Sequence, residues 1–169
     1  RPVVAAEHAA VFARAGVRSV ADLGCGIGAD SLEFARASLA TVSVELDPLT
    51  ASFAAANLAD FSGSRVVVGD VTNFNPESFR DGNGKVVQGI WLDPARRDLT
   101  GVVKSRTERI FDPEAYSPPL SFVVDLARTG MPMGVKLGPG MPHEAIARPE
   151  DIRSEANPHP RVTAQWVEH

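Results

Sequence analysis

The chain has 169 residues, 44% of them hydrophobic and 22% charged, which is the composition of one ordinary globular domain. Its formal net charge of -4 argues against a protein that grips nucleic acid with its whole surface, so any polyanion must be met by a local basic patch. The single cysteine excludes an internal disulfide framework, and no apolar run reaches the roughly 20 residues of a membrane span or resembles a signal peptide, so we expect a cytoplasmic protein without membrane contact.

Apolar residues at helical spacing predict a lead-in helix in residues 1–16, with Gly16 as its natural C-terminal stop. Strands and helices then alternate along the first half of the chain. We expect strands at residues 17–23, 41–45 and 65–69, with helices at residues 29–39 and 48–59 between them. This alternation is typical of parallel strands joined by right-handed helical crossovers.

The second half of the chain has a less regular pattern. A fourth apolar strand at residues 86–92 stops at Asp93, and the long, charged loop at residues 95–119 is expected to be a functional lid or a substrate-facing segment. We expect a helix at residues 121–128, a buried strand at 133–137 and a last strand at 161–167. The predicted fold class is therefore α/β, Rossmann-like, with a mostly parallel central sheet and helices on both faces.

The most informative stretch is VADLGCGIGAD at residues 20–30, because it combines a strand, a tight turn and the start of a helix. Gly24, Gly26 and Gly28 let backbone amides approach a ligand where any Cβ would collide, and the helix N-terminus behind them favours negative groups. A nucleotide-like ligand is expected there. The spacing of Gly24, Gly26 and Ala29 also fits a dinucleotide fingerprint, so the loop alone does not separate nicotinamide cofactors from S-adenosylmethionine.

Acidic residues at four successive strand ends favour S-adenosylmethionine. Asp22 can reach the methionine ammonium or order the loop, whereas its charge would repel a pyrophosphate. Glu45 is placed to accept hydrogen bonds from both ribose hydroxyls, and Asp70 with the backbone after it can read the adenine edge. Asp93 and Pro94 close the fourth strand. All four strand ends deliver polar groups to one crevice, which is where open α/β sheets bind ligands.

Four motifs, DLGCGIG, VELDP, VGDV and LDPAR, resemble those of the class I S-adenosylmethionine-dependent methyltransferases, over residues 17 to about 137. DLGCGIGADSLEFA with VELDP resembles the RNA-modifying enzymes related to trimethylguanosine synthase. WLDPARRD with DPEAYSPPLSFV is similar to a bacterial group whose catalytic domain is followed by a THUMP-like domain. The resemblance implies an RNA substrate and a cofactor-binding domain at residues 17–169 of a longer protein, its C-terminal substrate-recognition domain being absent here. It implies cofactor contacts from Asp22, Gly24, Cys25, Gly26, Gly28, Glu45, Leu46, Asp70 and Val71.

Methyl transfer from a sulfonium is an in-line displacement that requires orientation of the acceptor and exclusion of water, and no metal. We expect Asp93 and Pro94 to be the catalytic pair, with Asp93 accepting a hydrogen bond or a proton from the acceptor. Amine-methylating relatives follow the acid with two prolines and an aromatic, whereas this chain has Arg96 at the fourth position. Arg96 and Arg97 are expected to bind substrate, by stacking or by phosphate contact. The basic residues in and beside this loop are Arg96, Arg97, Lys104, Arg106 and Arg109.

Several of these residues also have a purely structural interpretation. Cys25 is expected to be mainly a small space-filling residue, since no base lies near it in the sequence. Asp47 and Pro48 most simply begin the helix that follows. Trp91 fits a core residue better than a stacking platform. The histidines have no metal-ligand spacing, so no metal site is predicted; they are His8, His143, His159 and His169.

Three alternatives to RNA methylation stay open. The first keeps the cofactor but changes the acceptor to a protein side chain or a small metabolite. The second is a module that binds cofactor or RNA without turnover, because the aromatic of the amine motif is absent. The third is a nicotinamide oxidoreductase, which the glycine spacing also allows.

Overall fold

A computed structural model describes residues 2–96, 113–138 and 141–165 of the chain, which falls into two compact units. One unit comprises the residues up to 93 together with 131–135, and the other comprises 94–130 and 136–169. Within the described ranges, no helix is both long and apolar enough to cross a membrane.

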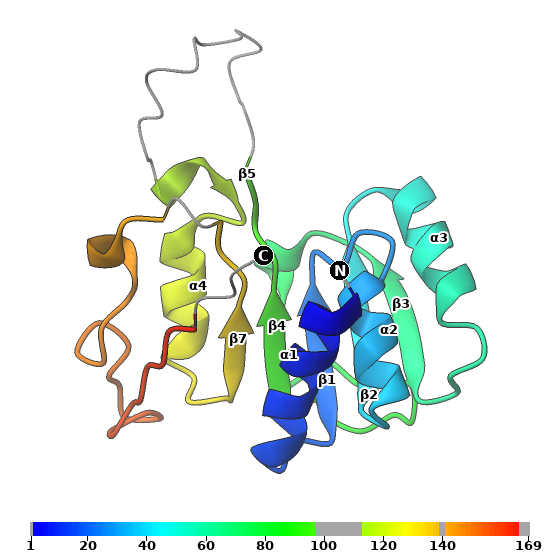
Figure 1. The fold of residues 1–169 in the computed structure, drawn as a ribbon, viewed down its shortest axis with the longest axis horizontal. Coiled ribbons are helices and arrows are strands. Elements are labelled where there is room, and N and C mark those ends of the chain that lie inside the picture. Colours follow the sequence, from blue (N-terminus) through cyan, green and yellow to red (C-terminus); the bar gives the residue numbers. More distant parts are fainter. Residues whose placement is uncertain (1, 97–112, 139–140, 166–169) are drawn as a thin grey trace, which may run out of the picture. The chain divides into compact units, whose positions relative to one another are not determined.

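A five-stranded parallel sheet forms the centre of the first unit (Figure 1). The strand order is β3-β2-β1-β4-β7. Strands β2 and β3 are therefore added on one side of β1, and β4 and β7 on the other side. The prediction of an α/β fold with a mostly parallel sheet is confirmed. The elements of this unit are α1 (Pro2–Arg14), β1 (Ser19–Leu23), α2 (Ala29–Arg36), β2 (Ala40–Glu45), α3 (Pro48–Asn57), β3 (Ser64–Val68), η1 (Val71–Asn73), β4 (Gly89–Leu92) and β7 (Met133–Val135).

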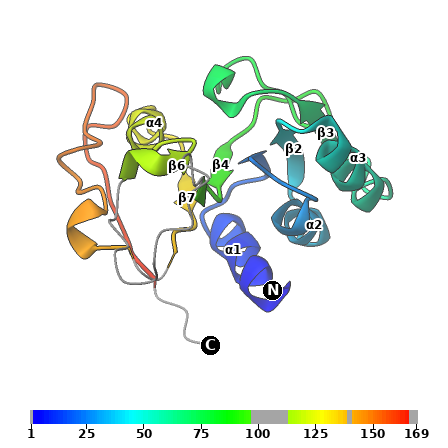
Figure 2. The same cartoon turned by 90° about the horizontal axis from the view of Figure 1, so that it is seen from above.

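Right-handed crossovers fix which elements cover each face of this sheet. The connections from β1 to β2 and from β2 to β3 run in the same direction, so α2 and α3 lie on one face. Helix α1 packs against α2 on that face (Figure 2). The connection from β3 to β4 runs in the opposite direction and therefore crosses the other face, where Phe74 and Val87 are buried.

The core under α1 and α2 is aromatic. Phe12, Phe34 and Trp91 are each at most 4% exposed, and their rings meet edge to face with centroids 5.7 to 6.4 Å apart. Gly89 and Gly134 give these rings room, because a Cβ at Gly134 would lie 2.6 Å from Cε3 of Trp91. Trp91 is therefore a core residue, as the sequence favoured.

Local signals set the ends of the helices. Gly16 follows α1 with a φ of 77°, in the left-handed region where glycine is favoured. Asp47 caps α3, since its Oδ1 accepts a hydrogen bond of 2.9 Å from the amide of Leu49, and Pro48 occupies the first turn. The predicted role of Asp47 and Pro48 in beginning this helix is confirmed.

The fourth strand begins later than predicted. We expected it at residues 86–92, but β4 begins at Gly89. Val86 instead forms an isolated antiparallel bridge with Arg80, and the amide of Val87 donates to the carbonyl of Phe79. These local bonds use the backbone groups that a longer β4 would need.

The second unit has a short ribbon, a helix and an irregular tail. In the ribbon, β5 (Ala95–Arg96) pairs antiparallel with β6 (Tyr116–Ser117), and η2 (Pro113–Ala115) leads into β6. Helix α4 (Leu120–Ala127) follows, and η3 (His143–Ala145) is the last regular element among the described residues. Most of the predicted loop, residues 97–112, lies outside the described residues.

The prediction of a last strand at residues 161–167 is wrong for residues 161–165, which have no regular structure. Residues 166–167 lie outside the described part. Alternating apolar residues predict a strand only where a neighbouring strand can bind their backbone, and Val162 is 39% exposed. The alternation here is therefore a feature of the sequence alone, because these residues pair with no strand among the described residues.

Candidate functional site

Four carboxylates follow one edge of the sheet in spatial order. The strands are parallel, so the carboxyl ends of β3, β2, β1 and β4 lie side by side and bring Asp70, Glu45, Asp22 and Asp93 into a row. The strand order reverses between β1 and β4, and this topological switch point is where open α/β sheets bind ligands. The structure thus brings the predicted strand-end acids to a single edge.

The glycine loop between β1 and α2 needs its glycines for two different reasons. Gly24, Gly26 and Gly28 all have positive φ, at 83°, 57° and 81°. A Cβ added at Gly24 or Gly26 would meet nothing within 4 Å, so their backbone faces open space. A Cβ at Gly28 would lie 3.3 Å from the Cβ of Ala54 on α3. Gly24 and Gly26 therefore leave room for a ligand, whereas Gly28 permits close packing against α3.

Glu45 accepts hydrogen bonds from backbone amides through both of its carboxylate oxygens. Oε2 accepts a hydrogen bond of 3.0 Å from the amide of Gly26, and Oε1 accepts one of 2.9 Å from the amide of Asp47. The backbone carbonyl of Glu45 also accepts from the amide of Gly69, next to Asp70. Each carboxylate oxygen has a second lone pair, so Glu45 can still accept a hydrogen bond from a ligand hydroxyl.

Asp22 is buried beneath the loop and bonded to α2. Its side chain is on the face of β1 that α2 covers, where its Oδ2 accepts a 2.5 Å hydrogen bond from the hydroxyl of Ser31. Ser31 in turn lies 2.8 Å from the hydroxyl of Ser43 on β2. Burial raises the pKa of Asp22 to about 7, opposed by the Ser31 hydrogen bond and reinforced by the charges of Asp30 and Asp93. These contacts bond the end of β1 to the first turn of α2, and contact of Asp22 with a cofactor stays a prediction.

The remaining predicted cofactor residues are more exposed. Asp70 caps η1, because its Oδ1 accepts from the amide and the hydroxyl of Thr72, both at 2.8 Å. Val71 is half-buried, and Leu46 is 50% exposed directly after Glu45. The exposed side chains of Leu46 and Asp70 suit a ligand that has a flat apolar part and polar edges.

Cys25 is a poor nucleophile in this position. Its thiol is half-buried between the two ligand-facing glycines, and its Sγ lies 3.5 Å from the carbonyl oxygen of Gly26. Burial, with the charges of Asp22 and Glu45, raises the pKa of the thiol well above its usual value. The thiolate is therefore disfavoured, in agreement with the space-filling interpretation of Cys25.

The predicted catalytic pair directly follows β4 in the chain. Asp93 is half-buried and directly follows β4 in the first unit, and its charge acts on Asp22. Pro94 is buried and begins the second unit, followed by β5 with Arg96. Arg97 lies outside the described residues, as do the other basic residues of the predicted cluster, Lys104, Arg106 and Arg109.

The sequence analysis missed the polar contacts that hold the loop from below. Ser31 binds Asp22 and is itself bonded to Ser43, and the side-chain amide of Asn57 donates to the carbonyl of Ile27 at 2.9 Å, which joins the loop to the end of α3. A signal for Ser43 was present, since TVSVE alternates polar and apolar residues and so indicates a strand with one polar face. No pattern in the sequence indicated Asn57.

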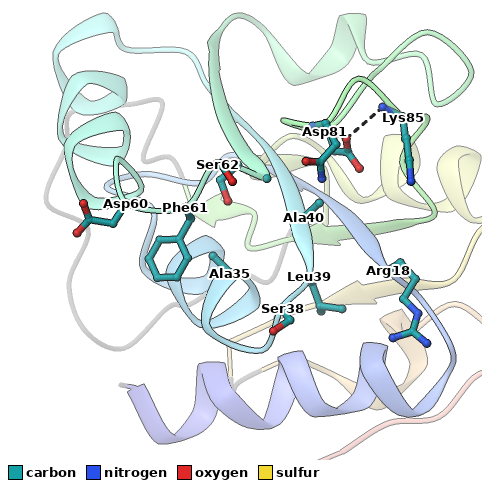
Figure 3. A pocket seen from close by; sticks show the side chains of 13 residues that line it. Arg18, Ala35, Ser38, Leu39, Ala40, Asp60, Phe61, Ser62, Asp81 and Lys85 are labelled. Atoms are coloured by element: carbon teal, nitrogen blue, oxygen red, sulfur yellow. Dashed lines mark hydrogen bonds between the residues drawn. The ribbon is translucent and has the colours of Figure 1, made fainter.

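A separate hollow of about 420 Å³ opens at the opposite, amino-terminal edge of the sheet (Figure 3). Arg18 precedes β1 and Ser64 begins β3, so this hollow is remote from the glycine loop. Its cations, Arg18 and Lys85, are accompanied by the carboxylates of Asp60 and Asp81. Asp81 already accepts backbone hydrogen bonds within its own turn, including that from the Lys85 amide at 3.1 Å. We therefore assign the candidate site to the glycine loop.

No family model and no curated protein matches the sequence. Among solved structures, the chain is similar to a putative RNA methyltransferase from Pyrococcus horikoshii, with 28% identity and a TM-score of 0.45 over 55% of this chain and 45% of that one. It is also similar to an O-methyltransferase from Bacillus cereus in complex with SAH, with 18% identity and a TM-score of 0.41 over 55% and 44%. A third is SAM-bound CalS10, an amino pentose methyltransferase from Micromonospora echinaspora, with 23% identity and a TM-score of 0.40 over 54% and 34%. The chain thus spans less than half the length of these structures.

Proposed function

We propose that this chain is the cofactor-binding and catalytic part of an S-adenosylmethionine-dependent methyltransferase that modifies a nucleobase in RNA. The observation that carries this proposal is the row of Asp70, Glu45, Asp22 and Asp93 along the carboxyl edge of the sheet, beside a glycine loop with an open backbone face. A row of acids is suited to a ligand that offers hydroxyls, an amine and a positive charge.

The chemistry of the donor set fits the cofactor. Glu45 keeps acceptor capacity for ribose hydroxyls, and exposed Leu46 follows it as an apolar surface for the adenine ring. Asp70 and the backbone at Val71 offer an acceptor and a donor for the edge of the base. At Gly24 and Gly26 a Cβ would meet nothing within 4 Å, so a ligand can approach the backbone closely. A dinucleotide is a poorer fit, because its pyrophosphate would lie beside Asp22, Asp30 and Asp93, whose charges act together.

The reaction itself requires little from the protein. When bound, S-adenosylmethionine would supply an electrophilic methyl group on a sulfonium, and an acceptor amine that takes this group would have to lose a proton. Asp93 orients the acceptor amine by accepting a hydrogen bond and takes up that proton, while buried Pro94 restrains the backbone after β4.

The RNA acceptor is supported by the sequence motifs and by the arginines that follow Asp93. Arg96 on β5 and Arg97 after it can stack on a base or bind a phosphate. We further propose, from the resemblance of the WLDPARRD motif, that a THUMP-like domain beyond this chain delivers the RNA. Methylation of a protein side chain or a small metabolite is the competing outcome in the experiments below.

Calorimetry with S-adenosylhomocysteine tests the cofactor directly. The folded chain is expected to bind it with one-to-one stoichiometry, and NADH titrated in parallel is expected to give no heat of binding. A folded sample that binds NADH and not S-adenosylhomocysteine would show that the cofactor assignment is wrong.

Transfer of a labelled methyl group tests the acceptor. RNA, protein and small-molecule fractions of one extract are offered to the full-length protein, and label is expected in RNA. Asp93→Ala is expected to abolish transfer, while Asp93→Asn keeps the hydrogen-bond acceptor and loses the proton acceptor, so it is expected to be partly active. Label in another fraction would identify the competing acceptor, and full activity of Asp93→Ala would remove Asp93 from the chemistry.

A further inference from the structure

The lead-in helix places an imidazole against the first turn of α2. Nδ1 of His8 on α1 lies 3.1 Å from Oδ1 of Asp30, and the two side chains are only 18% and 16% exposed. Asp30 is the second residue of α2 and follows Gly28, the glycine that begins this helix, by two positions. The contact therefore joins α1 to the place where the glycine loop becomes a helix.

The imidazole is also held through its face. The centroid of the His8 ring lies 4.2 Å from that of Trp91, with the ring planes inclined by 33°. Trp91 is 4% exposed and is itself held by the edges of Phe12 and Phe34. A side chain that stacks on a fixed core ring and contacts a carboxylate has one orientation, unlike a histidine on a solvated helix face.

The carboxylate that His8 contacts belongs to a group of interacting acids. Asp30 on α2 faces it directly, and the charges of Asp30 and of Asp93 after β4 both act on Asp22 at the end of β1. On α1 itself, the neighbouring Glu7 pairs with Arg14 at 2.8 Å. A contact that holds Asp30 in place therefore also fixes one of the charges that act on Asp22 beneath the glycine loop.

We propose that His8 is a positioning residue of the cofactor site, which holds Asp30 and thereby fixes the junction of the glycine loop with α2 in its binding geometry. This inference rests on the proposed function. It assigns helix α1 to the cofactor site, so this helix contributes to cofactor binding as well as to the fold. His8 acts through Asp30 and not by contact with the reacting atoms.

The test compares His8→Gln, His8→Ala and Asp30→Asn with the matched control His159→Gln, which changes an exposed histidine in the second unit. Calorimetry with S-adenosylhomocysteine is carried out on each variant under one set of conditions. Loss of one hydrogen bond of about 1 kcal/mol predicts an affinity roughly fivefold weaker for His8→Gln and for His8→Ala.

A double-mutant cycle separates positioning from general packing. The combined variant His8→Gln with Asp30→Asn is expected to bind no more weakly than the worse single variant, because both remove the same contact. Wild-type affinity of His8→Gln and Asp30→Asn, or strict additivity in the cycle, overturns the inference while leaving the proposed cofactor intact.

A measurement without cofactor keeps the two proposals distinguishable. Deuterium uptake at the amides of residues 24–31 is expected to rise in His8→Gln and to stay at the wild-type level in His159→Gln, with far-ultraviolet circular dichroism confirming that both are folded. Unchanged uptake in His8→Gln overturns the positioning role, whether or not the chain binds S-adenosylhomocysteine. Failure of the wild type to bind, with uptake raised as expected, refutes the proposed function alone.

Discussion

The hydroxyl of Ser31 donates a hydrogen bond of 2.5 Å to the carboxylate of Asp22, so the first turn of α2 is bonded to the end of β1 beneath the glycine loop. Asp22 is 2% exposed, and burial is the largest reason that its pKa is raised from 3.8 to about 7. One hydrogen bond therefore offsets part of the cost of keeping an acid in the core.

The raised pKa predicts how stability depends on pH. Between about pH 4 and 7 the unfolded chain has lost the Asp22 proton while the folded chain keeps it, so the free energy of unfolding falls as the pH rises through this range. The fall attributable to Asp22 is on the order of 4 kcal/mol and is complete above about pH 7. Asp22→Asn has no proton to lose and is expected to lack this component. Urea unfolding of both proteins across the range measures it, and parallel curves would show that Asp22 does not titrate as stated.

Glu45 is predicted to matter more for the cofactor than for the fold. Glu45→Ala removes the acceptor for the amides of Gly26 and Asp47 together with the proposed ribose contacts. The loss of two ribose hydrogen bonds is expected to weaken affinity for S-adenosylhomocysteine by roughly 2 to 4 kcal/mol. The control is Glu77→Ala, at an exposed acid in the segment between β3 and β4. Equal affinities of the two variants would remove Glu45 from the site.

Gly28 and Gly24 are predicted to fail in different ways when replaced by alanine. Both have positive φ, which costs an alanine roughly 1 to 2 kcal/mol. At Gly28 the new Cβ also lies 3.3 Å from that of Ala54, whereas at Gly24 it meets nothing. Gly28→Ala is therefore expected to lower the free energy of unfolding further than Gly24→Ala, while Gly24→Ala is expected to weaken binding of S-adenosylhomocysteine at little further cost in stability.

A compensating substitution checks the reason for the Gly28 effect. Ala54→Gly removes the methyl group that the new Cβ approaches, so Gly28→Ala is expected to cost less stability in the Ala54→Gly background than alone. Thermal unfolding of the four proteins measures this difference. Identical costs in both backgrounds would assign the effect to φ strain and not to packing against α3.

The order of elements around the glycine loop was predictable because it depends on local signals. VADLGCGIGAD contains a buried strand, three glycines at positions that need positive φ and a helix start, and Asp47-Pro48 contains a cap and a first-turn proline. Parallel pairing then followed from the alternation of strands and helices, which placed Asp22, Glu45 and Asp93 at one edge.

The contacts of the site side chains were not predictable in the same way. Asp22 was expected to reach the cofactor or order the loop, and only the packing of α2 on β1 shows that Ser31 binds it. His8 was one of four scattered histidines until the structure placed α1 over Asp30 and Trp91. Such contacts join residues far apart in the chain, and no local periodicity records them. The strand predicted at residues 161–165 is absent for a related reason. Its local alternation is present, but these residues pair with no strand among the described residues.

Gly134 on β7 is predicted to be essential to the packing of Trp91. A Cβ there would lie 2.6 Å from Cε3 and 2.7 Å from Cζ3 of the indole, so Gly134→Ala forces the ring toward Phe12, Phe34 and His8. Overpacking of this kind is expected to lower the free energy of unfolding by about 1 to 3 kcal/mol.

The matched control for Gly134 is Gly138→Ala, whose Cβ meets nothing within 4 Å. In a Trp91→Phe background the smaller ring leaves more room, so Gly134→Ala is expected to cost less stability there than in the wild type. Urea unfolding of the four proteins measures the coupling between positions 91 and 134. Because His8 stacks on Trp91, Gly134→Ala is also expected to weaken binding of S-adenosylhomocysteine, whereas Gly138→Ala is not. Additive costs at positions 91 and 134 would contradict the close approach of β7 to this ring.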